Sequence, residues 1–272
     1  MRTSRVRAKL NRQEPILVTA SSFQDPAVFE LTSLLGFDAI WLDLEHHVTS
    51  LEKAGELMRA ARVGTSDIMA RPAKGEFLRM SRMLEAGAHG IMYPRCDNAA
   101  EAREVVRWAK FPPLGQRGFD GGNADMPYCS MSMTDYLEMA NRENFIVIQI
   151  EDPQALEHVE EIAAVEGVDI IFLGPGDYSI ACGVPGQFEH PKLEAAIDRI
   201  AAATQKHGKA WGMPSGSPAR TKNLLARGAR FIAHGADIIF VKQGLEAIQK
   251  DFAPLGFTFD PRLSTTVSAP LV

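Results

Sequence analysis

Two acidic residues follow consecutive apolar segments of the chain, in a pattern that suits a divalent metal ion. Glu151 ends the apolar run FIVIQIE, where a carboxylate needs a metal, a cation or water to offset its lost hydration. Asp177 follows the next apolar run, in the segment LGPGD. Oxygen ligands with no Cys or His pair nearby favour a hard ion such as Mg²⁺ or Mn²⁺. The alternative is structural, with Glu151 and Asp152 capping a helix and Asp177 belonging to a turn.

A candidate general base lies in the segment WLDLEHH. His46 comes three residues after Asp43, so this carboxylate can hold the imidazole in one tautomer and raise its basicity. The adjacent His47 leaves the choice between the two histidines open, because only one of them need be more than a loop residue.

Two basic residues end apolar runs in the same way. Arg71, in MARP, precedes a proline and can pair with a substrate carboxylate or with a developing enolate oxygen. A salt bridge within the protein is the alternative. Lys242, in IIFVK, can form a Schiff base with a ketone, which would make a metal unnecessary, or it can be a solvated lysine at the start of a helix.

The segment GPGDYS carries Gly174 and Gly176. A loop that opens into a helix there would direct backbone N–H groups at a carboxylate or phosphate. A plain turn is the alternative, since Pro-Gly-Asp is common in turns.

The elements that must position these residues alternate along the chain. Eight apolar runs rich in Val, Ile, Leu and Phe are separated by amphipathic segments long enough for crossover helices, which predicts a closed (β/α)8 barrel. The strands are expected to begin near Pro15, Phe37, Asp67, His89, Phe145, Val168, Lys209 and Arg230, the last running through RFIAHGADIIFV. Helices are expected over 51–62, 76–86, 99–110 and 193–206. In such a barrel the residues at the carboxyl ends of the strands converge on one mouth.

The chain is expected to form one domain over residues 1–272. Two connections are too long for simple crossovers, an inserted loop and helix region at about 111–144 and a second at about 174–191. Long connections in compact domains are usually functional or contact a partner. The segment GQRGFDGGNADMPYCSM in the first connection is a candidate wall for a substrate pocket, and the tail at about 253–272 shows no clear pattern.

The composition excludes several classes of protein. With 272 residues, 46% of them hydrophobic and 23% charged, the chain is neither disordered nor fibrous. A net charge of −5 argues against a nucleic-acid partner. The three cysteines show no metal or disulfide spacing, and no segment has the character of a signal peptide or membrane span. We therefore expect a cytoplasmic protein that acts on small molecules.

With these positions identified, the chain resembles the HpcH/HpaI aldolase family, which are metal-dependent class II pyruvate aldolases that include the 2-keto-3-deoxy-sugar-acid aldolases. The similarity covers nearly the whole chain, through FDAIWLDLEHH, ARPAKGEF, MLEAGAHGIMYPRCDNAAEAREVVRWAKFPPLGQRGF, VIQIEDPQAL and IIFLGPGDYSIACG. It implies a TIM barrel of the phosphoenolpyruvate/pyruvate type. It also implies that the last helix is exchanged between subunits of a homo-hexamer built as a dimer of trimers.

The resemblance also implies an activity and a set of roles. The enzyme would reversibly cleave a 4-hydroxy-2-keto acid to pyruvate or hydroxypyruvate and an aldehyde, through an enolate held on Mg²⁺, Mn²⁺ or Co²⁺. The metal ligands would be Glu151 and Asp177, and the catalytic residues His46, Asp43 behind it, Arg71 as the stabiliser of the enolate, and Glu85. The contacts to the keto acid would come from Trp41, Gln149, Gly176 and Asp177.

The chain departs from the family at three positions. Glu85 stands where the family commonly has an Asp that raises the basicity of the catalytic histidine, Asp152 where it has Thr, and Gly176 where it has Ala or Ser. These differences bear on substrate choice and pH optimum. Two alternatives to an aldolase are a CoA-ester lyase of the citrate-lyase type, which needs a basic groove for the CoA phosphates, and a barrel that binds a keto acid without catalysis.

Overall fold

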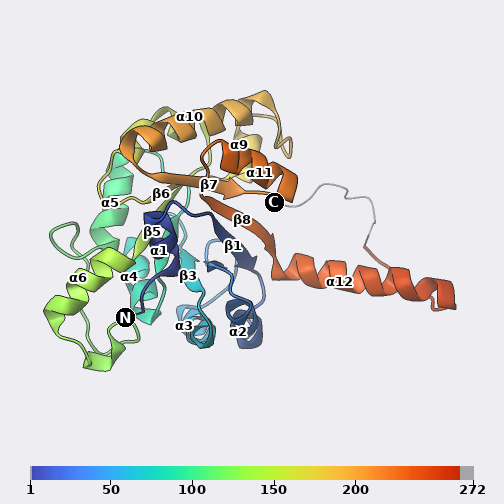
Figure 1. Ribbon diagram of the computed structural model, residues 1–272, viewed down its shortest axis with the longest axis horizontal. Helices are drawn as coiled ribbons and strands as arrows, with labels where there is room; N and C mark the ends of the chain where they lie inside the picture. The colour runs from blue at the N-terminus through green and yellow to red at the C-terminus, as the bar shows by residue number, and fades with distance from the viewer. Residues whose placement is uncertain (1, 264–272) are drawn as a thin grey trace.

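The structure is a computed structural model that describes residues 2–263, and its centre is a closed barrel of eight parallel strands (Figure 1). Each strand pairs with its neighbours in sequence, and β1 and β8 close the barrel. The expected (β/α)8 barrel is thus confirmed. The strands are β1 (Ile16–Ser21), β2 (Ala39–Asp43), β3 (Asp67–Arg71), β4 (Gly90–Tyr93), β5 (Phe145–Ile150), β6 (Ile170–Leu173), β7 (Ala210–Pro214) and β8 (Phe231–Ala236).

The strands read as continuous apolar runs because both of their faces are covered. Every residue of β5 and of β6 is buried, as expected for parallel strands packed between a barrel interior and a layer of helices. Val18, Phe145, Phe172 and Phe231 fill the interior. Gly90 is needed there, since a Cβ at this position would lie 2.2 Å from the Phe145 ring.

Helices surround the strands, and α3, α4, α5 and α10 each bury an apolar face in the core. The expected segments 51–62, 76–86, 99–110 and 193–206 coincide with α3, α4, α5 and α10. No helix among residues 2–263 combines the length and apolar character needed to cross a membrane. The helices are α1 (Arg5–Asn11), α2 (Pro26–Leu34), α3 (Leu51–Ala60), α4 (Phe77–Ala86), α5 (Ala99–Ala109), α6 (Met133–Glu143), α7 (Pro153–Glu157), α8 (Val159–Ala163), α9 (Pro175–Ala181), α10 (Pro191–His207), α11 (Pro218–Ala226) and α12 (Asp237–Phe252), with short 3-10 helices at Ala61–Val63, Pro127–Cys129 and Ala253–Leu255.

The last strand is shorter than its sequence indicates. β8 ends at Ala236, and the apolar run that follows Asp237 is the start of α12, which projects away from the barrel (Figure 1). The chain turns at Gly235, whose φ of +66° favours glycine. Lys242 therefore lies on an exposed helix, paired with Glu246, and not at the mouth. The expectation that places this lysine at the end of a strand is wrong.

The long connection between α5 and β5 lies at the amino-terminal end of the barrel, because α5 ends and β5 begins there. Its α6 packs through Tyr136 and Ala140 against Phe111 and Met126, and its Ala124 carbonyl accepts a hydrogen bond from Arg62, just after α3. The segment GQRGFDGGNADMPYCSM thus does not line the mouth of its own chain. Of the expected tail, residues 264–272 lie outside the described part of the chain.

Candidate active site

The carboxyl ends of the strands surround a cavity of about 230 Å³. It is lined by predicted site residues from four separate segments, namely Trp41, His46, Arg71, Gln149, Glu151, Gly176 and Asp177. Residues distant in sequence meet here because parallel strands end at the same edge of the barrel.

Asp43 and Arg71 form a buried ion pair between the ends of β2 and β3. The guanidinium donates from Nε to Oδ1 at 2.9 Å and from Nη2 to Oδ2 at 2.6 Å. Burial raises the pKa of Asp43, but the hydrogen bonds and charge of Arg71 outweigh it, so the pKa lies below its usual value. Arg71 also lies 4.6 Å from the Trp41 ring and 3.4 Å from Gln149 Oε1. Asp43 thus orients Arg71, whereas the sequence places it behind His46.

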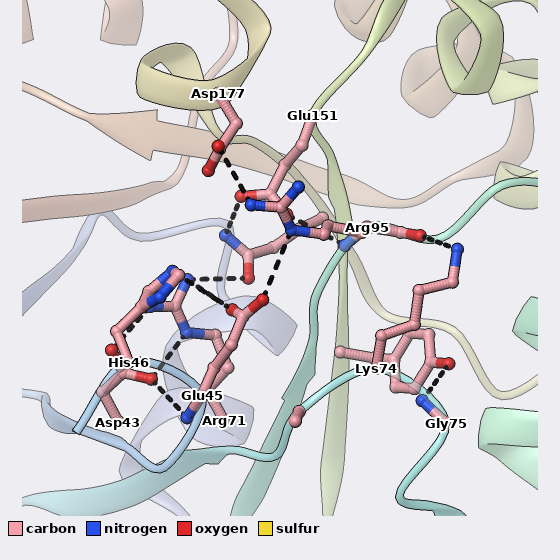
Figure 2. A network of polar contacts seen from close by, with 12 residues as sticks. Asp43, Glu45, His46, Arg71, Lys74, Gly75, Arg95, Glu151 and Asp177 are labelled. Atoms are coloured by element: carbon pink, nitrogen blue, oxygen red, sulfur yellow. Dashed lines mark hydrogen bonds and ion pairs between the residues drawn. The ribbon is translucent and has the colours of Figure 1, made fainter. Parts of the chain in front are cut away.

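His46 lies on the loop after β2 and lines the cavity, unlike His47. Its side chain is 51% exposed, and its Nε2 lies 3.6 Å from Glu45 Oε2 (Figure 2). The same Glu45 carboxylate pairs with Arg71 Nη1 at 3.2 Å. Glu45 is therefore the acidic neighbour of His46, a role that the sequence assigns to Asp43.

Glu151 is a buried carboxylate that follows β5 directly. Its oxygens accept from Gln149 Nε2 at 3.2 Å and from the backbone N–H of Arg95 at 2.9 Å. Burial raises its pKa to about 7, although the Arg95 N–H and the charge of Arg71 act in the opposite direction. Gly174 makes room for it, since a Cβ there would lie 2.4 Å from Glu151 Oε1. Glu151 is therefore a buried carboxylate at the cavity whose negative charge is only partly balanced by its neighbours.

Asp177 lies in the first turn of α9 and forms an ion pair with Arg95, which follows β4. Arg95 Nη2 lies 3.0 Å from Asp177 Oδ1, and Arg95 Nε lies 3.4 Å from Glu45 Oε1. Figure 2 shows the Arg95 guanidinium between the carboxylates of Asp177 and Glu45. The backbone of Arg95 is left-handed, with φ of +49°, and its carbonyl accepts from Lys74 Nζ at 2.7 Å. No role for Arg95 is predicted from the sequence.

The donor set fits a divalent ion that takes few protein ligands. Within residues 2–263 no group of three or more His, Cys, Asp or Glu side chains is placed to hold a metal. Mg²⁺ commonly binds through one or two carboxylates and completes its shell with water and substrate oxygens. Glu151 and Asp177, on adjacent strand ends beside a cavity, meet that requirement.

Glu85 is not brought to this site. It lies near the carboxyl end of α4, at the opposite end of the barrel, where burial raises its pKa and its main charged neighbours are Arg117, Asp120 and Arg82. Within one chain Glu85 therefore cannot raise the basicity of His46.

A polar residue that the sequence analysis does not single out also lines the cavity. His234 lies on β8, and its Nδ1 is 2.6 Å from the carbonyl oxygen of Ser215. In the sequence it is hidden within the last apolar run, FIAHGA.

Polar groups gathered at one mouth of a parallel barrel are the arrangement of barrel enzymes, and this is the class that the fold and the site define. The family model described as HpcH/HpaI aldolase/citrate lyase matches residues 20–243. The chain belongs to this family.

Relatives of known name agree with this membership. The chain is 33% identical over 238 residues to a hydroxypyruvate/pyruvate aldolase of Delftia acidovorans, which covers 87% of this chain and 88% of that protein. It is 32% identical over 217 residues to a 2-keto-3-deoxy-L-rhamnonate aldolase of Klebsiella pneumoniae, covering 80% of this chain and 81% of that one. An HpcH/HpaI aldolase structure from Desulfitobacterium hafniense matches with a TM-score of 0.88 at 27% identity, over 96% of this chain and 100% of that chain.

Proposed function

We propose that this protein is a metal-dependent aldolase that reversibly cleaves a 4-hydroxy-2-keto acid to pyruvate or hydroxypyruvate and an aldehyde. The observation that carries the proposal is the meeting of Glu151, Asp177, Arg71 and His46 around one cavity. Relatives that share about a third of their residues with this chain, over most of its length, are named as aldolases of this kind.

The cofactor in this proposal is Mg²⁺, Mn²⁺ or Co²⁺, held by Glu151 and Asp177. When bound, a divalent ion supplies Lewis-acid polarisation of the keto acid. The carboxylates fit this use because Glu151 is buried and because, within residues 2–263, Asp177 pairs only with the half-exposed guanidinium of Arg95.

Arg71 stabilises the negative charge that develops on the ketone oxygen during cleavage. The two hydrogen bonds to Asp43 already fix the Arg71 guanidinium, so it needs little reorganisation when negative charge develops on the ketone oxygen. Gln149 lies beside it, and Trp41 supplies an apolar wall. The backbone N–H groups of Gly176 and Asp177, at the start of α9, would contact the substrate carboxylate.

His46 moves the proton. In the cleavage direction it takes the proton of the C4 hydroxyl, the C3–C4 bond breaks, and the aldehyde leaves. The electron pair of that bond becomes the enolate, which regains a proton at C3 to give the keto acid. Glu45 Oε2, 3.6 Å from Nε2 of the imidazole, is the carboxylate placed to orient the ring.

Neither alternative enzyme mechanism gains support from the site. A Schiff base would need Lys242 at the mouth, but this lysine lies on α12. A CoA-ester lyase would need a basic groove, but Arg95, the exposed cation at the mouth, pairs with Glu45 and Asp177.

We further propose that α12 is exchanged between subunits of a homo-hexamer. Its exposed apolar residues recur at helical spacing on one face, namely Ile238, Val241, Leu245, Ile248 and Phe252. The outer side of β1 and α2 is also uncovered, with Leu17, Leu31, Leu34 and Leu35 exposed. A helix from a second copy would cover this apolar surface.

Light scattering during gel filtration tests the exchange. We expect Leu245→Lys to reduce the mass of the assembly. Gln243→Lys, which adds the same charge to the opposite face of α12, should leave it unchanged. An identical mass for the two variants would contradict the proposed exchange.

We also propose that the protein is cytoplasmic. This proposal is supported by Cys96, Cys129 and Cys182, which are free thiols in the structure and suit a reducing compartment.

The function itself is tested by aldol addition. Chelator-treated protein is mixed with pyruvate or hydroxypyruvate and a panel of aldehydes, with and without added Mg²⁺, Mn²⁺ or Co²⁺, and new 4-hydroxy-2-keto acids are detected by NMR. We expect product with at least one aldehyde, and only when metal is restored. No product from any combination would contradict the proposal.

A further inference from the structure

The active-site cavity has a polar side and an apolar side. The charged and amide groups come from the ends of β2, β3, β5 and β6. The side formed by β7, β8 and β1 contributes mostly side chains without polar atoms, which are Ala20, Pro214, Ala233 and Gly235. Among the described lining residues of that side, His234 is the one with a polar side chain.

His234 is held in one tautomer. Its Nδ1 lies 2.6 Å from the carbonyl oxygen of Ser215, and because a carbonyl can only accept, the proton must be on Nδ1. In the neutral ring Nε2 is therefore an acceptor. No group among residues 2–263 forms a hydrogen bond with Nε2.

The anchor of this imidazole is itself fixed. Ser215 is 3% exposed, and its backbone N–H donates to the Ala233 carbonyl at 2.9 Å. Its hydroxyl accepts from Thr221 Oγ1 at 2.9 Å. Ser215 thus fixes the His234 ring through Nδ1, and Nε2 remains as an acceptor for a ligand in the cavity.

We propose that His234 determines donor specificity, and that it does so by accepting a hydrogen bond from a hydroxyl on C3 of the keto acid. This inference rests on the proposed function. The carboxylate and ketone oxygens of the donor would bind on the polar side, beside Arg71 and the divalent ion that Glu151 and Asp177 would hold. The carbon end then faces the wall that carries His234.

A 3-hydroxy-2-keto acid such as hydroxypyruvate satisfies Nε2, whereas the methyl group of pyruvate leaves it unpaired. An unpaired polar group in a confined site is unfavourable, and sites built around a hydroxyl discriminate against the analogue that lacks it. The structure therefore assigns hydroxypyruvate as the better donor, with His234 as the residue responsible.

The test compares the two donors in aldol addition with one aldehyde and one metal. For wild-type protein we expect a higher kcat/KM with hydroxypyruvate. His234→Val should lower this value by about 10- to 100-fold, whereas the pyruvate value should rise, because no unpaired acceptor is left against the methyl group. His234→Gln, whose amide can both donate and accept, should retain part of the preference. Thermal unfolding shows whether each variant is folded.

His158→Val is the matched control, because it makes the same replacement at a half-exposed imidazole that does not line the cavity. Its donor ratio should equal that of the wild type. An equal loss with both donors in His234→Val, or a wild-type preference for pyruvate, would overturn the inference and leave the aldolase proposal intact. A wild-type protein that adds neither donor to any aldehyde with metal present would overturn both.

Discussion

The two ends of the barrel carry similar ionisable residues but use them differently. At the amino-terminal end the acidic side chains are covered by α1 and by the residue before it, and they pair with basic residues of this helix. Arg5 pairs with Asp38 at 2.6 Å, and Arg7 forms two hydrogen bonds to Asp169, at 2.6 and 2.7 Å. These contacts join segments far apart in sequence, and they hold the barrel together.

At the mouth the charges are arranged around a cavity instead. Glu151 is buried without a full ion pair, His46 is half exposed, and Arg95 reaches across from β4 to Asp177. The comparison teaches that charge near a barrel strand has two uses. Where the chain itself supplies the partner, the charge serves stability, and where a cavity lies beside it, the charge remains available to a ligand.

The largest effect is expected from removing a charge at the mouth. Glu151→Gln keeps the shape of the side chain but removes the proposed anionic metal ligand, so aldol activity should fall by more than about 10³-fold. Its thermal unfolding midpoint should stay near that of the wild type, because no ion pair is lost.

Asp169→Asn is the matched change at the other end. It leaves Arg7 without its carboxylate, so we expect a lower unfolding midpoint with aldol activity retained. If Glu151→Gln were active, or if Asp169→Asn lost activity while still folded, the distinction between the two ends would be wrong.

Arg71→Lys tests whether the hydrogen-bond geometry of this residue matters at the mouth, or its charge alone. Lysine keeps the charge but cannot form the paired hydrogen bonds to Asp43 and also reach Gln149. Steady-state kinetics should show kcat lower by about 10²-fold. A kcat within threefold of the wild type would mean that the charge alone is sufficient.

At the amino-terminal end, the buried Lys110 predicts how the free energy of unfolding depends on pH. It is buried, its Nζ donates to the carbonyl oxygens of Asn141 and Asn144, and burial lowers its pKa to about 7. Between this value and the usual pKa of 10.5, the unfolded chain binds more protons than the folded one. This residue therefore makes the free energy of unfolding rise with pH over that window, by at most about 1.4 kcal/mol per pH unit.

Denaturant unfolding from pH 7 to 10 measures this contribution as the difference between wild type and Lys110→Met. We expect the rise to be missing from the variant, and aldol activity at pH 7 to be unaffected. Parallel pH profiles for the two proteins would refute the role of Lys110.

The smallest effect is expected at Arg95. Its guanidinium is half exposed, pairs with Asp177 and interacts electrostatically with Glu151, so its repulsion of a divalent ion is screened by water. Arg95→Met should raise the affinity for Mn²⁺ by a few-fold in a calorimetric titration. A weaker affinity in the variant would show instead that Arg95 helps to hold the ligands in place.

The fold was largely predictable because parallel strands covered on both faces leave long apolar runs, as in β5 and β6. The end of β8 was not predictable in this way. The apolar residues that follow Asp237 belong to α12, whose apolar face is uncovered in one chain, and a short apolar run does not distinguish a strand from such a helix.

The candidate site was predictable where a polar residue directly ends an apolar run, as with Glu151 and Arg71. Its partners were not, because they depend on neighbours in space. Asp43 turned out to hold Arg71, and Glu45 is the acid beside His46. The place of Glu85 did follow from the predicted topology, since the helix expected over 76–86 runs back from the mouth and carries Glu85 near its carboxyl end.

The most direct test of the central claim is exchange of the C3 protons of pyruvate and of hydroxypyruvate in D₂O, followed by NMR, because it needs no aldehyde. Wild-type protein is compared with chelator-treated protein, with metal-restored protein and with His46→Ala. We predict exchange that requires both the metal and His46. Exchange that persists in chelator, or no exchange of either keto acid after metal is restored, would contradict the account.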